Sequence, residues 1–307
     1  MSSPKRSSKR IATSDTARIG FIGAGRLATA IINGLVAYGK IDPKRIFVAA
    51  PSVSNSENLK LTHKGLRTTK RNIDIFGRFD CDIVFLCITP NVIRNLYKMG
   101  GTKPAALTTN YIPNMRHPVY VLSMIFGFNL NQLKECLLNP ENPNRYMVKF
   151  HRCVMSCTAA YAIGYCWIDV EPDSPQLPDL VRKIINLIAK IEYLPENQMD
   201  AACSIVGAGL SFCYYFINAM SDGALKIGLP RSTSIKFTAK VASVAAETLL
   251  ETGKNANQLK DEASSPSGGA IYGISVLDKA EVASGICGAV EAAFKRAQTL
   301  ATLGIQD

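Results

Sequence analysis

A glycine-rich turn near the start of the chain has residue types suited to binding phosphate groups. Its residues are Gly23, Ala24, Gly25, Arg26, Leu27 and Ala28, a G-x-G-x-x-A spacing. The first glycine permits a tight turn, the second lets the backbone approach a pyrophosphate, and the last alanine allows close helix–strand packing. The amides and positive dipole end of a helix beginning here stabilise phosphate charge. The turn therefore predicts a dinucleotide site, and Arg26 is either a phosphate contact or a solvated side chain.

The residues that separate NAD from NADP binding stand at the end of the next apolar run. A site that prefers NAD usually has a carboxylate there, which accepts a hydrogen bond from the ribose 2′-hydroxyl. This chain has AAPS over residues 49–52, and its next carboxylate is Glu57. The sequence therefore predicts NADP as cofactor. Ser52, Ser54 and Asn72 are polar candidates for contacts at the adenosine end, and the sequence shows no certain arginine clamp.

Apolar patterning places the glycine turn inside a βαβ unit. Arg18–Ile22 is a short strand, Thr29–Tyr38 has helical apolar spacing, and Arg45–Ala50 is a second buried strand. Further strands are predicted at Asp82–Ile88, Val119–Phe126, Ala162–Ile168 and Glu192–Leu194. Further helices in this half are predicted at Val92–Met99 and Asp179–Lys190. These elements predict a parallel, doubly wound sheet of the Rossmann type.

From Glu196 onward the chain becomes rich in alanine and poor in strand signals. Helices are predicted over Asn197–Ile227, Ser232–Glu251, Asn257–Glu262, Ala270–Leu277 and Ala280–Leu300. We therefore predict an α/β fold with three parts. These are a disordered basic tail over residues 1–17, a dinucleotide-binding Rossmann domain over 18–196, and a helical substrate and dimerisation domain over 197–307.

The positive charge of the chain is concentrated at its start. The 307 residues carry a formal net charge of +11, and the first 18 hold five Lys and Arg against one Asp. We interpret this segment as a solvated tail and predict no nucleic-acid partner. It lacks the apolar core of a secretory signal and hardly supplies the amphipathic face of a mitochondrial presequence. A cytoplasmic location is predicted, with the mitochondrion as the less favoured alternative.

Cysteine and histidine usage argues against disulfide and metal frameworks. Nine cysteines lie mostly in apolar runs without a C-x-x-C motif, which indicates reduced thiols. The three histidines are far apart, at no metal-ligand spacing, so no metal site is predicted.

One uncharged segment, Ala201–Ser221, has 21 residues and is long enough to span a bilayer. Its serines and asparagine, and the flanking Asp200 and Asp222, favour a soluble protein instead. The segment is then a buried core helix or a subunit-interface helix. We predict no membrane span and a homodimer or higher homo-oligomer, because a small helical domain offers little surface to bury such a helix.

Landmark motifs recur in one order along residues 18–300. They are IGFIGAGRLATAIINGL, DIVFLCITPNVI, DGALKIGLPR, ETGKNANQLKDEASSPSGGAIYGISVLD and GAVEAAFKRA. In these motifs the chain resembles the pyrroline-5-carboxylate reductase family, whose members catalyse the last step of proline synthesis. The C-terminal motifs are the more specific part of the resemblance. The resemblance implies hydride transfer from carbon 4 of the nicotinamide to the imine carbon of a small carboxylate substrate, with no side chain assigned as catalytic.

The resemblance also implies roles for individual residues. The cofactor-binding residues it implies are Ile22, Gly23, Ala24, Gly25, Arg26, Leu27, Pro51, Ser52, Asn72, Ile88, Thr89 and Glu262. The substrate-binding residues it implies are Ser264, Ser265, Ser267, Gly268, Gly269 and Ala270, a loop whose amides hold the substrate carboxylate at a helix N-terminus.

The substrate loop departs from the family pattern. That pattern commonly reads SSPGGTT, whose last threonine hydroxyl contacts the ring nitrogen, whereas Ala270 stands there in this chain. Ser267 replaces the first glycine, and Thr89 replaces a frequent lysine. A lost hydrogen bond costs about 1–3 kcal/mol if its partner stays buried. The leading hypothesis is NADPH-dependent reduction of 1-pyrroline-5-carboxylate to L-proline. Two alternatives stay open: a non-catalytic dinucleotide-binding paralogue, and a reductase of another small imine or carbonyl compound.

Overall fold

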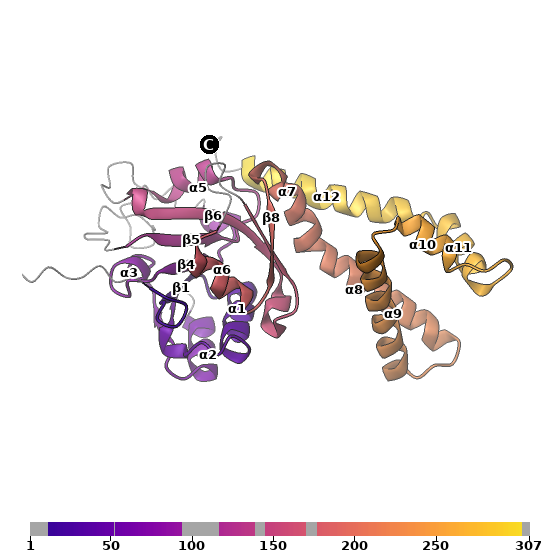
Figure 1. Ribbon diagram of the computed structural model, residues 1–307, viewed down its shortest axis with the longest axis horizontal. Helices are drawn as coiled ribbons and strands as arrows, with labels where there is room; N and C mark the ends of the chain where they lie inside the picture. The colour runs from indigo at the N-terminus through magenta and orange to yellow at the C-terminus, as the bar shows by residue number, and fades with distance from the viewer. Residues whose placement is uncertain (1–11, 52, 94–116, 139–144, 170–176, 303–307) are drawn as a thin grey trace, which may run out of the picture. The chain divides into compact units, whose positions relative to one another are not determined.

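The computed structural model describes residues 12–51, 53–93, 117–138, 145–169 and 177–302 (Figure 1). Two compact units make up the chain, namely residues 1–207 together with 296–307, and residues 208–295. The first unit contains the sheet and the second is helical.

One eight-stranded sheet in the order β3-β2-β1-β4-β5-β6-β7-β8 forms the centre of the first unit (Figure 1). Its strands are β1 Ile19–Ile22, β2 Ile46–Ala49, β3 Arg67–Thr69, β4 Ile83–Leu86, β5 Val119–Ser123, β6 Val148–Met155, β7 Tyr165–Asp169 and β8 Lys190–Leu194. Strands β1 to β6 run parallel to one another, β7 is antiparallel to β6, and β8 is parallel to β7. The predicted Rossmann-type sheet is confirmed.

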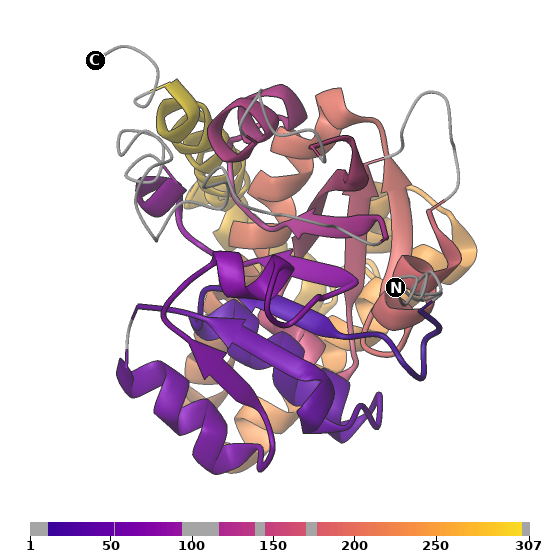
Figure 2. The same cartoon turned by 90° about the vertical axis from the view of Figure 1, so that its left-hand side faces the viewer.

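Helices cover both faces of this sheet (Figure 2). Their bounds are α1 Arg26–Ala37, α2 Val53–Thr62, α3 Ile73–Phe76, α5 Leu130–Leu137 and α6 Asp179–Asn186. Helices α1 and α6 pack on one hydrophobic cluster, in which Phe21 stacks on Phe85 at 5.0 Å. Helices α3 and α5 pack on the other, in which Phe47 stacks on Phe79 at 4.7 Å. Strands β1, β2 and β4 are therefore buried on both faces, which explains their continuous apolar runs.

Strand β6 is the longest strand described, and the sequence analysis assigns no strand to it. Its apolar run is interrupted by Lys149, His151 and Arg152, which hides the pattern of a buried strand. Arg152 is nevertheless buried, because Asp200 on α7 neutralises its guanidinium. His151 is also buried, with its Nδ1 3.3 Å from Asp169 Oδ1. The backbone amide of Arg152 donates a 2.8 Å hydrogen bond to Asp169 Oδ1 on β7. A buried ion pair thus stands where an apolar residue would be expected.

The last residues of the predicted tail, 12–17, form a turn next to β1. The Arg45 side chain holds this turn through Nε, which donates to the Ala17 carbonyl at 2.9 Å, and through a second bond to the Ser14 carbonyl at 2.5 Å. Ala17 is fully buried. Residues 1–11 lie outside the described part of the chain.

A short helix, α7 Met199–Cys203, and a π-helical turn, Ser204–Ala208, lead toward the second unit. That unit contains α8 Gly209–Lys226, α9 Arg231–Thr252, α10 Ala256–Glu262, α11 Gly269–Lys279 and most of α12 Val282–Thr302. The predicted helix over 197–227 thus contains a π turn, a feature that inserts one extra residue into a helix.

Most apolar side chains of α8 are exposed in the single chain. Tyr215 is 81% exposed, Tyr214 59% and Phe216 41%. Of the two alternatives for residues 201–221, burial in the core of one chain is therefore wrong. By length and composition, Glu196–Lys226 also meets the requirements for a membrane-crossing helix. The absence of a membrane span stays a prediction.

Candidate dinucleotide and substrate sites

The glycine turn follows β1, where the strand order of the sheet reverses. Strand β1 has β2 on one side and β4 on the other. The amide of Gly23 donates to the Ala49 carbonyl at 2.8 Å, and the amide of Cys87 donates to the Ile22 carbonyl at 2.8 Å. These bonds hold the carboxyl ends of the three strands together. Such a switch point is where open α/β sheets bind ligands.

The two glycines of the turn are needed for different reasons. Gly23 has φ +102°, and a Cβ there would lie 2.3 Å from the Cys87 carbonyl oxygen. The fold itself therefore excludes any side chain at Gly23. At Gly25, a Cβ would meet no protein atom within 4 Å. Because the fold tolerates a side chain at Gly25, its absence leaves open space for a ligand.

Helix α1 begins at Arg26 with Gly25 as its N-cap and no side-chain capping hydrogen bond. Arg26 is exposed, while Ala28 is fully buried against the sheet. An adjacent hollow of about 450 Å³ is lined by α1, Asn55 and the 3₁₀ turn Cys157–Tyr161. An uncapped helix N-terminus beside a cation and an open glycine suits a pyrophosphate. The residues present therefore fit the phosphate groups of a dinucleotide.

The adenosine-end candidates lie at the edge formed by β2 and β3. Pro51 is exposed, Ser54 is exposed on α2, and Asn72 is buried at the start of α3. Ser52 lies outside the described residues. The amide of Ala50 donates to the Thr69 carbonyl at 3.0 Å, which joins the ends of the two strands.

The candidates for the nicotinamide half follow β4. Ile88 is partly buried against the hydrophobic cluster beneath α3 and α5. Thr89 is exposed, and its carbonyl accepts a 2.9 Å bond from the Val92 amide as a helical turn begins. The predicted helix Val92–Met99 lies mostly outside the described residues. Burial, with a smaller contribution from Cys157, raises the pKa of the neighbouring Cys87 thiol to about 12, so it is a neutral thiol at pH 7 and no nucleophile.

A buried polar group missed by the sequence analysis anchors α7 to β6. Arg152 is 4% exposed and pairs with Asp200 and, at 3.9 Å, with Glu196. Glu196 Oε1 also accepts a 2.6 Å bond from the Leu130 amide at the start of α5. His151 Nδ1 lies 3.3 Å from Asp169 Oδ1 without hydrogen-bond geometry. The register of β6 with β7 and the packing of α7 on β6 bring these distant residues together, so sequence spacing gives no signal for them.

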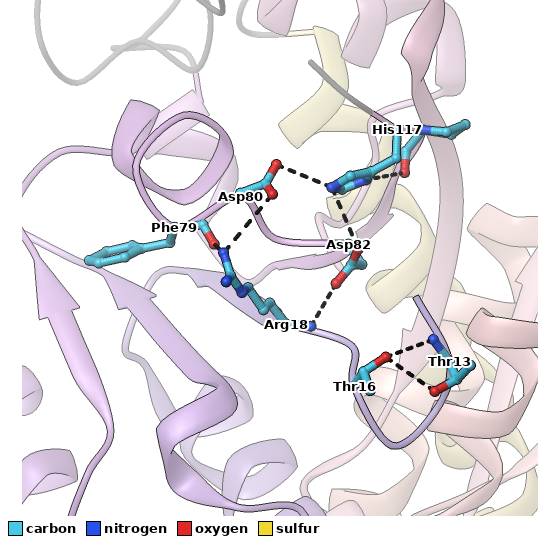
Figure 3. A network of polar contacts seen from close by, with 8 residues as sticks. Thr13, Thr16, Arg18, Phe79, Asp80, Asp82 and His117 are labelled. Carbon is cyan, nitrogen blue, oxygen red and sulfur yellow. Dashed lines mark hydrogen bonds and ion pairs between the residues drawn. The ribbon is translucent and has the colours of Figure 1, made fainter. Parts of the chain in front are cut away.

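A second charged group lies where β1, β4 and β5 begin, the sheet edge opposite the glycine turn (Figure 3). The amide of Arg18 donates to Asp82 Oδ2 at 2.7 Å, and its side chain lies 4.0 Å from Asp80. His117 Nε2 lies 3.1 Å from Asp80 and 3.6 Å from Asp82. Because parallel strands begin at the edge opposite their carboxyl ends, this group fixes the strand starts and does not face the candidate site.

The predicted substrate loop connects α10 to α11 in the second unit. Ser267 has φ +56°, a left-handed conformation that favours glycine, so the serine there is strained. Gly268 is the N-cap of α11, and a Cβ there would lie 2.3 Å from Ser265 Oγ. Gly269 has open space around its missing side chain. Helix α11 has no side-chain cap, so its first amides suit a carboxylate.

One hydroxyl group of this loop, that of Ser264, is already hydrogen-bonded within the protein. Ser264 Oγ donates to the Lys260 carbonyl at 2.8 Å, which closes the end of α10. Ala270 is exposed on the first turn of α11 and has no group that can donate to a ring nitrogen.

Glu262, predicted to contact the cofactor, is paired with Lys254 Nζ at 2.8 Å and with Gln258 Nε2 at 2.9 Å. These bonds lower the pKa of its carboxyl group. Its contact with a cofactor stays a prediction.

Two family models match the chain. Residues 196–300 match the pyrroline-5-carboxylate reductase dimerisation family. Residues 18–107 match the family described as NADP oxidoreductase, coenzyme F420-dependent. The two matches cover the helical half and the first part of the sheet.

Curated relatives and solved structures cover nearly the whole chain. Pyrroline-5-carboxylate reductase 3 of Danio rerio is 29% identical over 92% of this chain and 91% of its own length. Pyrroline-5-carboxylate reductase of Synechocystis is 28% identical over 92% of this chain and 98% of its own length. The Plasmodium falciparum pyrroline carboxylate reductase structure, with NADP bound, has a TM-score of 0.73 at 22% identity and covers 94% of this chain and 99% of that one.

An open glycine turn at a sheet switch point, followed by a helical dimerisation region, defines a dinucleotide-dependent oxidoreductase of the Rossmann class. Within that class, the relatives along the whole chain agree with the motif resemblance. Residues 196–300 match the pyrroline-5-carboxylate reductase dimerisation family, and along nearly its whole length the chain is similar to pyrroline-5-carboxylate reductases.

Proposed function

We propose that this protein uses NADPH to reduce 1-pyrroline-5-carboxylate to L-proline. One observation carries the proposal: a glycine turn open to a pyrophosphate stands in the same chain as a helical half that matches the pyrroline-5-carboxylate reductase dimerisation family. The relatives that cover both halves are named for this reductase activity.

The first unit supplies the cofactor contacts. Residues 22–27 bind the pyrophosphate through the uncapped start of α1, and Arg26 adds a cation there. The adenosine end of NADPH is lined by Pro51, Ser52 and Asn72. The nicotinamide half contacts Ile88 and Thr89. The bound cofactor supplies the hydride, and the protein supplies orientation.

The second unit supplies the carboxylate-binding loop. The first amides of α11, next to Gly268 and Gly269, hold the substrate carboxylate without a basic side chain. The ring nitrogen of the imine needs a proton as the hydride arrives. Because Ala270 has no hydroxyl, that proton comes from water or from another group.

Substitution of Ala270 tests this reading of the loop. Ala270→Thr restores a hydroxyl, and we expect it to raise kcat by about 10-fold, the value of one hydrogen bond of about 1.4 kcal/mol. Proline formation from NADPH and 1-pyrroline-5-carboxylate measures the effect. An unchanged or lower kcat in Ala270→Thr contradicts the role of this position.

Gly25→Val is the matched control for cofactor use. A Cβ at this position meets no protein atom within 4 Å, so we expect the variant to fold, which circular dichroism checks. It occupies the space proposed for the pyrophosphate, and we expect NADPH binding to weaken by at least about 10-fold. Full NADPH binding by this folded variant contradicts the proposed cofactor site.

The second candidate function is NADPH binding without catalysis, and the loop favours it through two features. Ser267 is strained and Ala270 lacks a hydroxyl, so the loop is altered at two neighbouring positions. This candidate predicts NADPH binding to the unmodified protein with no proline formed by it or by Ala270→Thr.

The exposed apolar faces of α8 and α9 support a homodimer or larger homo-oligomer of this chain. Besides Tyr215, the exposed residues include Phe237 at 54% and Leu250 at 75%. Burial of such a surface between copies is favourable at about 25 cal/mol per Å² of apolar area. Light scattering should give a mass of at least twice 33.3 kDa, and a monomer contradicts the proposal.

We also propose the cytoplasm as the location of the protein. The nine cysteines, mostly in apolar runs without a C-x-x-C motif, suit reduced thiols in a reducing compartment. Fractionation of cells that express the full chain tests this, and recovery with mitochondria contradicts it.

A further inference from the structure

Two cations, Lys70 and Arg71, follow β3 and have no assigned role. Thr69, the last residue of β3, pairs in register with Ala49 at the end of β2. The Ala50 amide then donates to the Thr69 carbonyl. Because neighbouring strands lie about 4.8 Å apart, residues 70 and 71 emerge beside the end of β2. This is the place where a Rossmann site meets the ribose 2′ position.

The turn that carries these cations is fixed. Thr69 Oγ1 accepts a 3.2 Å bond from the Arg71 amide and donates to Asp74 Oδ2 at 2.5 Å. The Asp74 amide in turn donates to the Arg71 carbonyl at 3.1 Å. These bonds set the backbone of residues 70 and 71. The carboxylate of this turn, Asp74, is thus hydrogen-bonded to Thr69.

The two side chains themselves are exposed. Across the described ranges, no hydrogen bond or ion pair engages the Lys70 ammonium or the Arg71 guanidinium. Two adjacent positive charges therefore face solvent at this edge, where residues 49–51 carry no carboxylate. Such an edge attracts an anion, and residues 49–51 offer no carboxylate to accept a hydrogen bond from a neutral ribose hydroxyl.

We propose that Lys70 and Arg71 hold the 2′-phosphate of NADPH and so select NADPH over NADH. A phosphate monoester carries about −1.5 to −2 charge at pH 7, and arginine binds it through two parallel hydrogen bonds. NADH has an uncharged hydroxyl there, so the pair adds nothing to its binding. The inference rests on the dinucleotide site of the proposed function, but not on the substrate or on catalysis.

Isothermal titration calorimetry of the full chain with 2′,5′-ADP and 5′-AMP tests the pair without any enzymatic reaction. The unmodified protein should bind 2′,5′-ADP at least about 10-fold more tightly than 5′-AMP. Arg71→Gln and Lys70→Gln should each weaken 2′,5′-ADP binding by about 10-fold, the value of one charge-assisted hydrogen bond at an exposed site. Affinity for 5′-AMP should stay unchanged, and Arg71→Lys should retain part of the preference.

Lys64→Gln is the matched control, because it removes the same charge from an exposed lysine in the turn before β3, at the other end of that strand. It should leave both affinities unchanged. Equal losses in Lys64→Gln and Arg71→Gln overturn the proposal, because they show an effect of net charge alone. No preference for 2′,5′-ADP in the unmodified protein, or an undiminished preference in the two Gln variants, also overturns it. If the unmodified protein prefers 2′,5′-ADP but forms no proline, the proposed function is wrong and the role of Lys70 and Arg71 still stands.

Discussion

The glycine turn of the first unit and the serine loop of the second are both glycine-containing starts of helices, yet they differ in how the protein constrains them. Gly23 is required by its neighbours, since a Cβ would lie 2.3 Å from a backbone oxygen. Ser267 adopts a conformation suited to glycine although it is not one. The proposed cofactor turn therefore agrees with its fold, whereas the proposed substrate loop carries strain. We infer that the cofactor side keeps the family geometry while the substrate side has diverged.

The largest expected effect is a loss of stability when Gly23 of the glycine turn is replaced. Gly23→Ala forces a Cβ into the Cys87 carbonyl and an unfavourable φ, so we expect a loss of about 3 kcal/mol or more in the free energy of unfolding. Urea denaturation measures it. Gly25→Ala is the matched comparison, with an expected loss under about 1 kcal/mol as an N-cap change. Equal losses at the two glycines contradict the distinction between them.

A smaller effect is a gain in stability when the backbone strain at Ser267 is removed. Ser267→Gly removes the left-handed strain, and we expect the free energy of unfolding to rise by about 1 kcal/mol. The gain is partly offset by the greater freedom of glycine in the unfolded chain. Thermal unfolding of the two proteins checks this expectation. A clear loss of stability shows that the serine side chain makes a favourable contact instead.

The smallest effect concerns pH. Lys254 lowers the pKa of Glu262, so the pair stabilises the folded state above the carboxyl's unfolded pKa, and this stabilisation is lost as pH falls through the folded pKa. Lys254→Gln should raise the pKa of Glu262 toward its ordinary value, as NMR titration can measure. Because the pair is exposed, only a slight change in stability is expected. An unchanged pKa contradicts the pairing.

The parts of the fold that the sequence predicts are those built from uninterrupted apolar runs. Strands β1, β2 and β4 are buried along their whole length, so their residues are apolar and easily recognised. The sequence does not predict strand β6, because Arg152 is buried as an ion pair with Asp200 and only the packed structure brings the two together. Helix α2 was missed because few of its residues are apolar.

The candidate site divides in a similar way. Spacing alone predicts the glycine turn, because Gly23 and Gly25 act locally. The neighbouring position of Lys70 and Ala50 depends on strand register, which the sequence does not show. The left-handed conformation of Ser267 was equally unpredictable, since serine rarely adopts it. Long-range pairing and local strain are therefore what the structure adds.

Transfer of deuterium tests the central claim most directly. The unmodified protein is mixed with 1-pyrroline-5-carboxylate and with NADPH in which deuterium replaces both hydrogens on carbon 4 of the nicotinamide, and the products are analysed by mass spectrometry. We predict one L-proline, deuterated on its ring carbon 5, for each NADPH oxidised, at about 1 s⁻¹ or faster. NADPH that binds but yields no deuterated proline contradicts the claim that this chain is a pyrroline-5-carboxylate reductase.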